Sequence, residues 1–186
     1  MGDVTGASSP SIVIRPESSG DHQAICRVVA SAFKSDLEAG LVDRIRASPE
    51  YVAEMALVAE IDDEIVGHVM ISGAVIRRES GERKIVMLSP LAVAPPRQRE
   101  GIGGSLVRAA IAIAEARREP LVVLEGDPAY YGRFGFEHAA RYGIKMHLPE
   151  WAPPEAAQVV LFPAFDPEDP SLCGTVDYPR AFDGLE

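Results

Sequence analysis

The sequence is poor in the features that mark several classes of protein. It contains two cysteines, Cys26 and Cys173, which lie far apart, so neither a disulfide framework nor a zinc site is expected. No apolar run approaches the roughly 20 residues that a membrane helix needs. The first ten residues lack a basic region and an apolar core, so they do not resemble a signal peptide. These absences predict a cytoplasmic protein with no bound metal and no membrane partner.

Positive charge is also in short supply. Lysine and arginine number 18 against 28 aspartates and glutamates, which gives a formal net charge of −10. A surface of this sign disfavours nucleic acid, because binding phosphates requires clustered basic residues. It is compatible with a cationic or amine substrate drawn in by long-range attraction, although the same charge also serves solubility.

The composition is otherwise that of an ordinary globular chain. Of 186 residues, 47% are hydrophobic and 25% are charged, and the length favours one domain with a substantial core. Residues 1–10 are rich in glycine, serine and alanine and are predicted to be disordered. We expect residues 11–165 to form the domain and residues 166–186 to form an extended tail packed on it.

Hydrophobic periodicity predicts alternating strands and helices of an α/β (α+β) fold. Two-residue alternation indicates strands, and apolar residues three and four apart indicate helices. Strands are predicted at 11–16, 56–61, 65–77, from 84 onward, at 121–125, 142–148 and 157–162, and helices after 21, over 36–47, after 101 and from 128, with an extended segment at 174–182.

The most informative stretch runs from Met87 to Arg118. An apolar run interrupted by Pro90 predicts a strand that is bulged or unpaired there, because proline has no N–H for the ladder. A polar turn and glycines at 101, 103 and 104 follow, and then a helical period begins. The first turn of such a helix has unpaired N–H groups and partial positive charge. The stretch therefore predicts a site for a phosphate or diphosphate, with Gln98 and Arg99 as further donors.

Two familiar phosphate motifs fit this stretch poorly. A P-loop needs a lysine after its last glycine, and Gly104 is followed by Ser105 and Leu106. A dinucleotide fingerprint needs a third glycine where Leu106 stands, and Glu125 is only loosely placed as its acidic residue. The dinucleotide interpretation, which would make the protein an NAD-binding oxidoreductase, is weakened but stays open at this point.

The pattern Q-x-x-G-x-G at Gln98, Gly101 and Gly103 resembles the acyl-CoA diphosphate loop of the GNAT superfamily of N-acetyltransferases. The match around this loop runs from Leu88 to Val107, and the resemblance as a whole covers roughly residues 12–162. It includes a second motif, GDPAYYGRFGF at 126–136, which is similar to one subgroup of predicted bacterial N-acetyltransferases. It implies a mixed, largely antiparallel sheet with one parallel pair, formed by the strand before the loop and the strand 121–125. That pair is splayed to admit acyl-CoA, and helices cover both faces.

The resemblance also implies roles for individual residues. Tyr131 would be the general acid that protonates the departing thiolate, with adjacent Tyr130 as its competitor. Apart from the resemblance, Glu125 and Asp127 stand at the C-terminal end of the strand 121–125, where α/β sites open, and either could serve as base. Acetyl-CoA would be the cosubstrate and a primary amine the acceptor, in a monomer or homodimer. An acyl-CoA sensor with the same fold is the alternative. The residues expected to bind the cosubstrate are Leu91, Ala92, Val93, Gln98, Arg99, Gly101, Ile102, Gly103, Gly104, Ser105, Tyr131 and Arg133.

Overall fold

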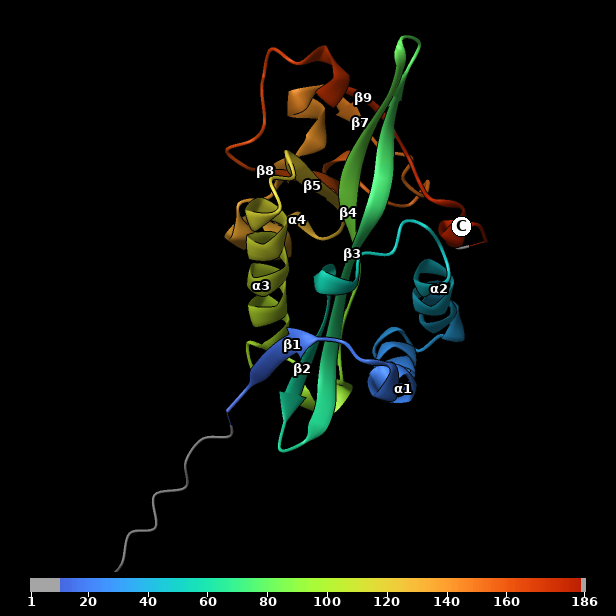
Figure 1. The fold of residues 1–186 in the computed structure, drawn as a ribbon, viewed down its shortest axis with the longest axis vertical. Helices are drawn as coiled ribbons and strands as arrows, with labels where there is room; N and C mark the ends of the chain where they lie inside the picture. The colour runs from blue at the N-terminus through green and yellow to red at the C-terminus, as the bar shows by residue number, and fades with distance from the viewer. Residues whose placement is uncertain (1–10, 185–186) are drawn as a thin grey trace, which may run out of the picture.

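The computed structural model describes residues 11–184, and the predicted disorder of residues 1–10 lies outside them. Within that range one mixed sheet carries the fold, with strand order β1-β2-β3-β4-β5-β8-β6 and with β9 bridging β3 and β7. Helix α3 lies on one side of this sheet, and α1 and α2 lie on the other (Figure 1). The predicted class, a largely antiparallel mixed sheet with helices on both faces, is confirmed.

Most predicted elements form close to their expected bounds. The α-helices are α1 (His22–Phe33), α2 (Asp36–Arg46), α3 (Ile102–Ala116) and the short α4 (Pro128–Tyr131). The strands are β1 (Val13–Pro16), β2 (Ala56–Ile61), β3 (Glu64–Arg78), β4 (Gly81–Val93), β5 (Leu121–Glu125), β6 (Glu137–His138), β7 (Ile144–Lys145), β8 (Ala157–Leu161) and β9 (Gly174–Asp177). No helix within residues 11–184 is long and apolar enough to cross a membrane.

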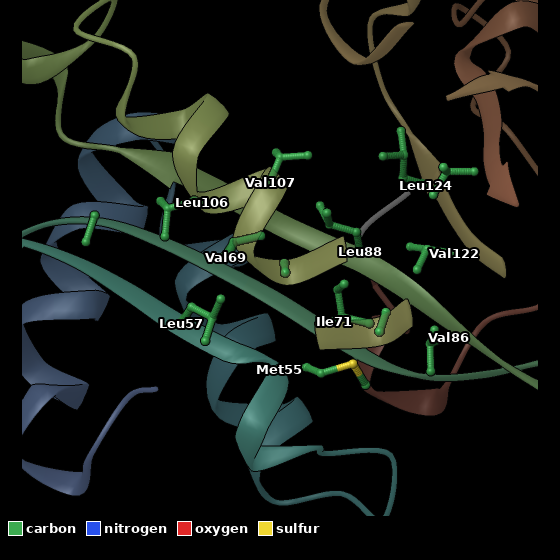
Figure 2. Close-up of a cluster of buried hydrophobic side chains, with 14 of the residues drawn as sticks. Met55, Leu57, Val69, Ile71, Val86, Leu88, Leu106, Val107, Val122 and Leu124 are labelled. Carbon is green, nitrogen blue, oxygen red and sulfur yellow. The ribbon is translucent and has the colours of Figure 1, made fainter. Parts of the chain in front are cut away.

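The core is divided by the sheet into layers. On the α3 side, Leu106 and Val107 of α3 pack with Val69 and Ile71 of β3 and with neighbouring β-strand residues (Figure 2). On the other side a second cluster lies beneath α1 and α2, and a third lies where the C-terminal segments cover the sheet. Because successive strand residues point to opposite faces, each central strand contributes to both layers.

The predicted interruption at Pro90 is present and shapes the middle of the sheet. Val69 of β3 faces Leu91 while Ile71 faces Leu88, so Ser89 and Pro90 form a bulge in β4. The parallel partner β5 pairs with β4 at only two positions, Val86↔Val122 and Met87↔Val123. Beyond Met87 the two strands separate, as the predicted splay requires.

One strand is much shorter than predicted. The expected strand 142–148 is reduced to Ile144–Lys145, and a 3₁₀ turn occupies 139–142. Gly143, at φ 69°, turns the chain in the left-handed region, and β7 has pairing partners only at Gly174 and Thr175. The extended C-terminal segment contributes β9, which pairs with β3 and so adds to the sheet. The boundary of the domain at residue 165 remains a prediction.

Candidate active site

The loop before α3 presents free backbone donors. Arg99 (φ 67°) and Gly101 (φ 85°) both adopt the left-handed region, and Gly101 is the N-cap of α3. In the described part of the chain no side chain caps this helix, and its first internal hydrogen bond, from Ser105 N to Gly101 O, is 3.0 Å long. The N–H groups of Ile102, Gly103 and Gly104 therefore point out of the helix end, where an anion binds well.

Two glycines of this loop leave room for aromatic rings. A Cβ atom built on Gly103 would lie 2.6 Å from Tyr130 Oη, and one built on Gly104 would lie 3.4 Å from the Phe134 ring. The ring hydroxyl of Tyr130 thus points at the first turn of α3. The side chain of Ile102, by contrast, is buried in the core, which leaves its backbone N–H to face a ligand.

Two arginines flank the same end of α3. The Arg133 guanidinium lies 4.6 Å from the centroid of the Tyr130 ring, and that of Arg108 lies 5.1 Å from the Phe134 ring. The sequence predicted Arg133 as a cosubstrate-binding residue but not Arg108. The sequence does hold an indication of it, since Arg108 stands four residues after Gly104, which brings the two onto one face of the helix. Both guanidiniums add positive charge beside the free N–H groups.

Gln98 is used within the chain in this structure. Its Nε2 donates to the Val93 carbonyl over 3.1 Å, which ties the loop to the end of β4. The Arg99 side chain is exposed. Contact of either side chain with a ligand remains a prediction.

The open edge of β4 begins at the bulge. Ala94 N donates to Val66 O of β3 over 2.8 Å, so the main-chain groups of Ala94 face β3. Since successive residues face alternate edges of the sheet, those of Val93 and Leu91 face the gap left by β5. Ala92 lies opposite His68 of β3, and its main-chain groups belong to that side. Leu91 and Val93 are therefore the two residues that can pair with a ligand lying in the gap.

The two tyrosines lie on the α3 side of the gap but in different surroundings. Both pack against the α3-side core, with ring centroids 4.9 Å apart. The Tyr131 ring lies against Gly126, where a built Cβ would come within 2.3 Å of it, and it meets Phe136 edge-on. Burial raises the pKa of the Tyr131 phenol well above its usual range, so the hydroxyl is protonated at neutral pH. Tyr131 thus stands at the end of β5, whereas Tyr130 reaches toward Gly103.

Glu125 lies on the opposite face of the sheet. Val123 belongs to the third core cluster and Leu124 to the α3-side cluster, so by alternation Glu125 points away from α3. In the parallel pair, Met87 of β4 lies opposite Val123 of β5. Glu125, two residues after Val123, is therefore level with Ser89 at the bulge. Its carboxylate accepts a hydrogen bond from Tyr178 Oη. Burial raises the pKa of Glu125, and this hydrogen bond opposes the rise.

The other acidic candidate has a structural role. Asp127 is the N-cap of α4, and its Oδ1 accepts from Ala129 N over 2.9 Å. A carboxylate engaged in this way fixes the turn that carries both tyrosines. The site therefore brings together free N–H groups, two tyrosines and two arginines on one face of a split sheet, and the half-buried Glu125 carboxylate on the other.

Comparison with known proteins identifies this arrangement. Residues 13–139 match a family model described as an acetyltransferase (GNAT) domain. The chain belongs to the GNAT acetyltransferase family. This assignment replaces the dinucleotide interpretation, which the sequence had left open at Leu106.

The relatives support the same assignment. The uncharacterized N-acetyltransferases YhbS and YjhQ of Escherichia coli are 32% and 31% identical over 139 and 133 residues, covering 74% and 70% of this chain and 81% and 74% of theirs. The solved structure of E. coli YhbS in complex with CoA superposes with a TM-score of 0.81 over 96% of both chains, at 28% identity. A GNAT acetyltransferase from Brucella melitensis in complex with acetyl-CoA has a TM-score of 0.74 at 32% identity, covering 93% of this chain and 99% of that one.

Proposed function

We propose that this GNAT protein transfers an acetyl group from acetyl-CoA to a primary amine by direct attack. The observation that carries the proposal is the split between β4 and β5, with tyrosines on one face and Glu125 on the other. Solved relatives that bind CoA and acetyl-CoA support the choice of cosubstrate. The start of α3 fits its diphosphate, since its uncapped N–H groups and the neighbouring guanidiniums of Arg108 and Arg133 all suit an anion.

The gap orients the thioester. The main-chain groups of Leu91 and Val93 pair with the amides of the pantetheine arm. Without such a partner, each buried N–H or C=O group would destabilise the complex by about 1–3 kcal/mol. This pairing holds the acetyl carbonyl at the bulge near Ser89, where the amine approaches from the Glu125 face. Holding two reactants in attack geometry is a large part of the catalysis, because a thioester is already activated.

Proton transfers complete the reaction. The amine nitrogen attacks the carbonyl carbon, a C–N bond forms, and the C–S bond breaks. Glu125 takes the proton that the nitrogen loses, directly or through water. Tyr131 donates its hydroxyl proton to the departing sulfur and is reprotonated from solvent. Tyr130, with Arg133 stacked on its ring, contacts the cosubstrate at the start of α3.

Turnover tests this function. Purified protein with acetyl-CoA and a panel of primary amines should release CoA thiol in proportion to acetylated amine, measured by a thiol reagent and by mass spectrometry. Protein without amine, and amine without protein, are the controls. Saturable CoA binding with no thiol release under any amine would instead support an acyl-CoA sensor.

The role of Glu125 is tested by the pH dependence of kcat/KM. A base must be deprotonated to act, so activity is expected to fall as the pH drops through the pKa of Glu125, which burial raises above its ordinary value. Glu125→Gln should lower kcat about 10²-fold and remove this fall of activity at low pH, the acidic limb of the pH profile. Asp127→Asn, which keeps a cap, should retain the limb. An acidic limb that survives in Glu125→Gln would assign the base elsewhere.

A further inference from the structure

A cavity of about 780 Å³ opens on the face of the sheet away from α3. Its floor is the β4 bulge and Glu125, so it meets the proposed reaction centre. Its walls come from the α1–α2 junction, the loop at 147–151 and the C-terminal segment after β9. That last segment lies beside α2, where Arg44 Nε donates to Ala181 O over 2.7 Å (Figure 1). The cavity is thus reached from the side opposite the start of α3, as an acceptor site requires.

The cavity is lined by charge of one sign. Five carboxylates line it, and among the described residues no lysine or arginine does. Two of the five are engaged, Asp177 with Arg77 and Glu125 with Tyr178. The remaining three, Glu38, Glu150 and Asp183, form no ion pair within residues 11–184. Such a wall repels anions and attracts cations.

Glu38 carries a second indication of a missing partner. Its Oε2 is buried and has no hydrogen-bond partner among the described residues. Leaving a buried carboxylate oxygen unpaired is unfavourable, and Glu38 is half-buried and lines the cavity, so a cation bound to the rest of its carboxylate would offset the charge that the two oxygens share. Glu38 stands in the first turn of α2, while Glu125 stands at the end of β5, so the two carboxylates come from different walls.

The same cavity has exposed aromatic walls. Trp151 is 84% exposed and Phe33 is 42% exposed, although both are large apolar side chains. Phe182 and Leu148 add apolar surface. Aromatic faces bind alkyl chains by burying them and attract cations through the ring quadrupole. An occupant is therefore expected to be both apolar in part and cationic.

We infer that the acceptor is a diamine or polyamine: one amine reacts at the bulge beside Glu125 while a second ammonium group is held by Glu38, and the alkyl chain lies along Trp151. The inference rests on the proposed acetyl transfer, and it names the substrate class for that site. The distal ammonium donates hydrogen bonds to the Glu38 carboxylate, and Glu150 and Asp183 add attraction without direct contact. No covalent step beyond the acetyl transfer is involved.

Matched amines test the inference. We expect kcat/KM for 1,8-diaminooctane to exceed that for n-octylamine about tenfold or more, because one charge-assisted hydrogen bond contributes about 1.4 kcal/mol or more. With 8-aminooctanoate, whose distal group is negative, transfer should be slower than with n-octylamine. Glu38→Gln should abolish most of the preference for the diamine, and Asp183→Asn should reduce it less. Glu115→Gln, an exposed position on α3, is the control that should leave the preference intact.

Binding of the diamine can be measured separately from acetyl transfer. Trp151 is the sole tryptophan of the chain, so its fluorescence reports on this cavity. Titrating 1,8-diaminooctane into the protein with CoA should change tryptophan fluorescence, with about tenfold weaker apparent affinity in Glu38→Gln.

The outcomes separate the two proposals. Transfer to both amines with no preference for the diamine, or a preference unaffected by Glu38→Gln, would overturn the inference and leave the acetyl transfer intact. Fluorescence binding that depends on Glu38, without transfer to any amine, would support the cation site and overturn the proposed function. Absence of both binding and transfer would overturn both.

Discussion

Replacing Tyr131 by phenylalanine should lower kcat for acetyl transfer about 10²-fold or more while leaving the dissociation constant of CoA within a few-fold of its original value. The Tyr131 ring is held against Gly126 and Phe136, and phenylalanine retains those contacts. The variant therefore loses the hydroxyl that we propose protonates the departing sulfur, and little else. Thiol release at saturating acetyl-CoA gives kcat, and calorimetry with CoA gives the affinity.

The neighbouring tyrosine provides the matched control. The Tyr130 hydroxyl points at Gly103 rather than toward the end of β5, so Tyr130→Phe should retain kcat within a few-fold and act mainly on CoA affinity. Tyr142→Phe, whose hydroxyl donates to Glu137 on the surface, should change neither quantity. An active Tyr131→Phe together with an inactive Tyr130→Phe would move the role by one residue.

Replacing Gly103 by aspartate should weaken CoA binding about 10³-fold. The new carboxylate would stand in the first turn of α3, beside the free N–H groups that we propose bind the diphosphate, and two unit charges at about 4 Å in an effective dielectric near 20 repel by about 4 kcal/mol. The side chain would also collide with Tyr130, whose hydroxyl lies 2.6 Å from the position of its Cβ. Calorimetry with CoA measures the loss directly.

Two further variants separate charge from volume. Gly103→Ala introduces the collision with Tyr130 but no charge, so it should weaken CoA binding less than Gly103→Asp does. Adding Tyr130→Phe removes the colliding hydroxyl and should restore part of the CoA affinity that Gly103→Ala loses. Gly20→Asp makes the same chemical change at an exposed glycine beside α1 and should leave CoA affinity unchanged. Retained affinity in a folded Gly103→Asp protein would place the diphosphate away from this loop.

The arrangement of the site separates two chemical environments by a sheet. Helix α3, the tyrosines and the arginines make one face positive and suited to a phosphorylated cosubstrate, whereas carboxylates line the cavity on the other face. The bulge at Ser89 and Pro90 connects them, because there the strands stop pairing. In the proposed reaction each substrate would meet a field of opposite sign to its own charge, and the carbonyl would lie between the two faces.

Much of this could be predicted from local patterns. The strand interrupted at Pro90, the turn with Gly101, and the amphipathic period after it each depend on residues a few positions apart, and the structure places the bulge and α3 as predicted. The strand predicted over 142–148 was too long. An apolar segment forms a strand only where a partner strand is available, and β9 pairs with β7 at two residues only.

The sequence by itself determined the free helix end after Gly101, the break in β4 and the pair Tyr130–Tyr131, since short-range backbone geometry dictates these features. Tertiary structure alone decided that Glu125 lines the cavity away from α3 while Asp127 caps a helix, that Tyr130 points at Gly103, and that Arg108 lies beside Gly104 and Phe134. It also brought Tyr178 to Glu125 across 53 residues of chain. Contacts of this kind arise from packing between distant segments, which no local spacing of residues encodes.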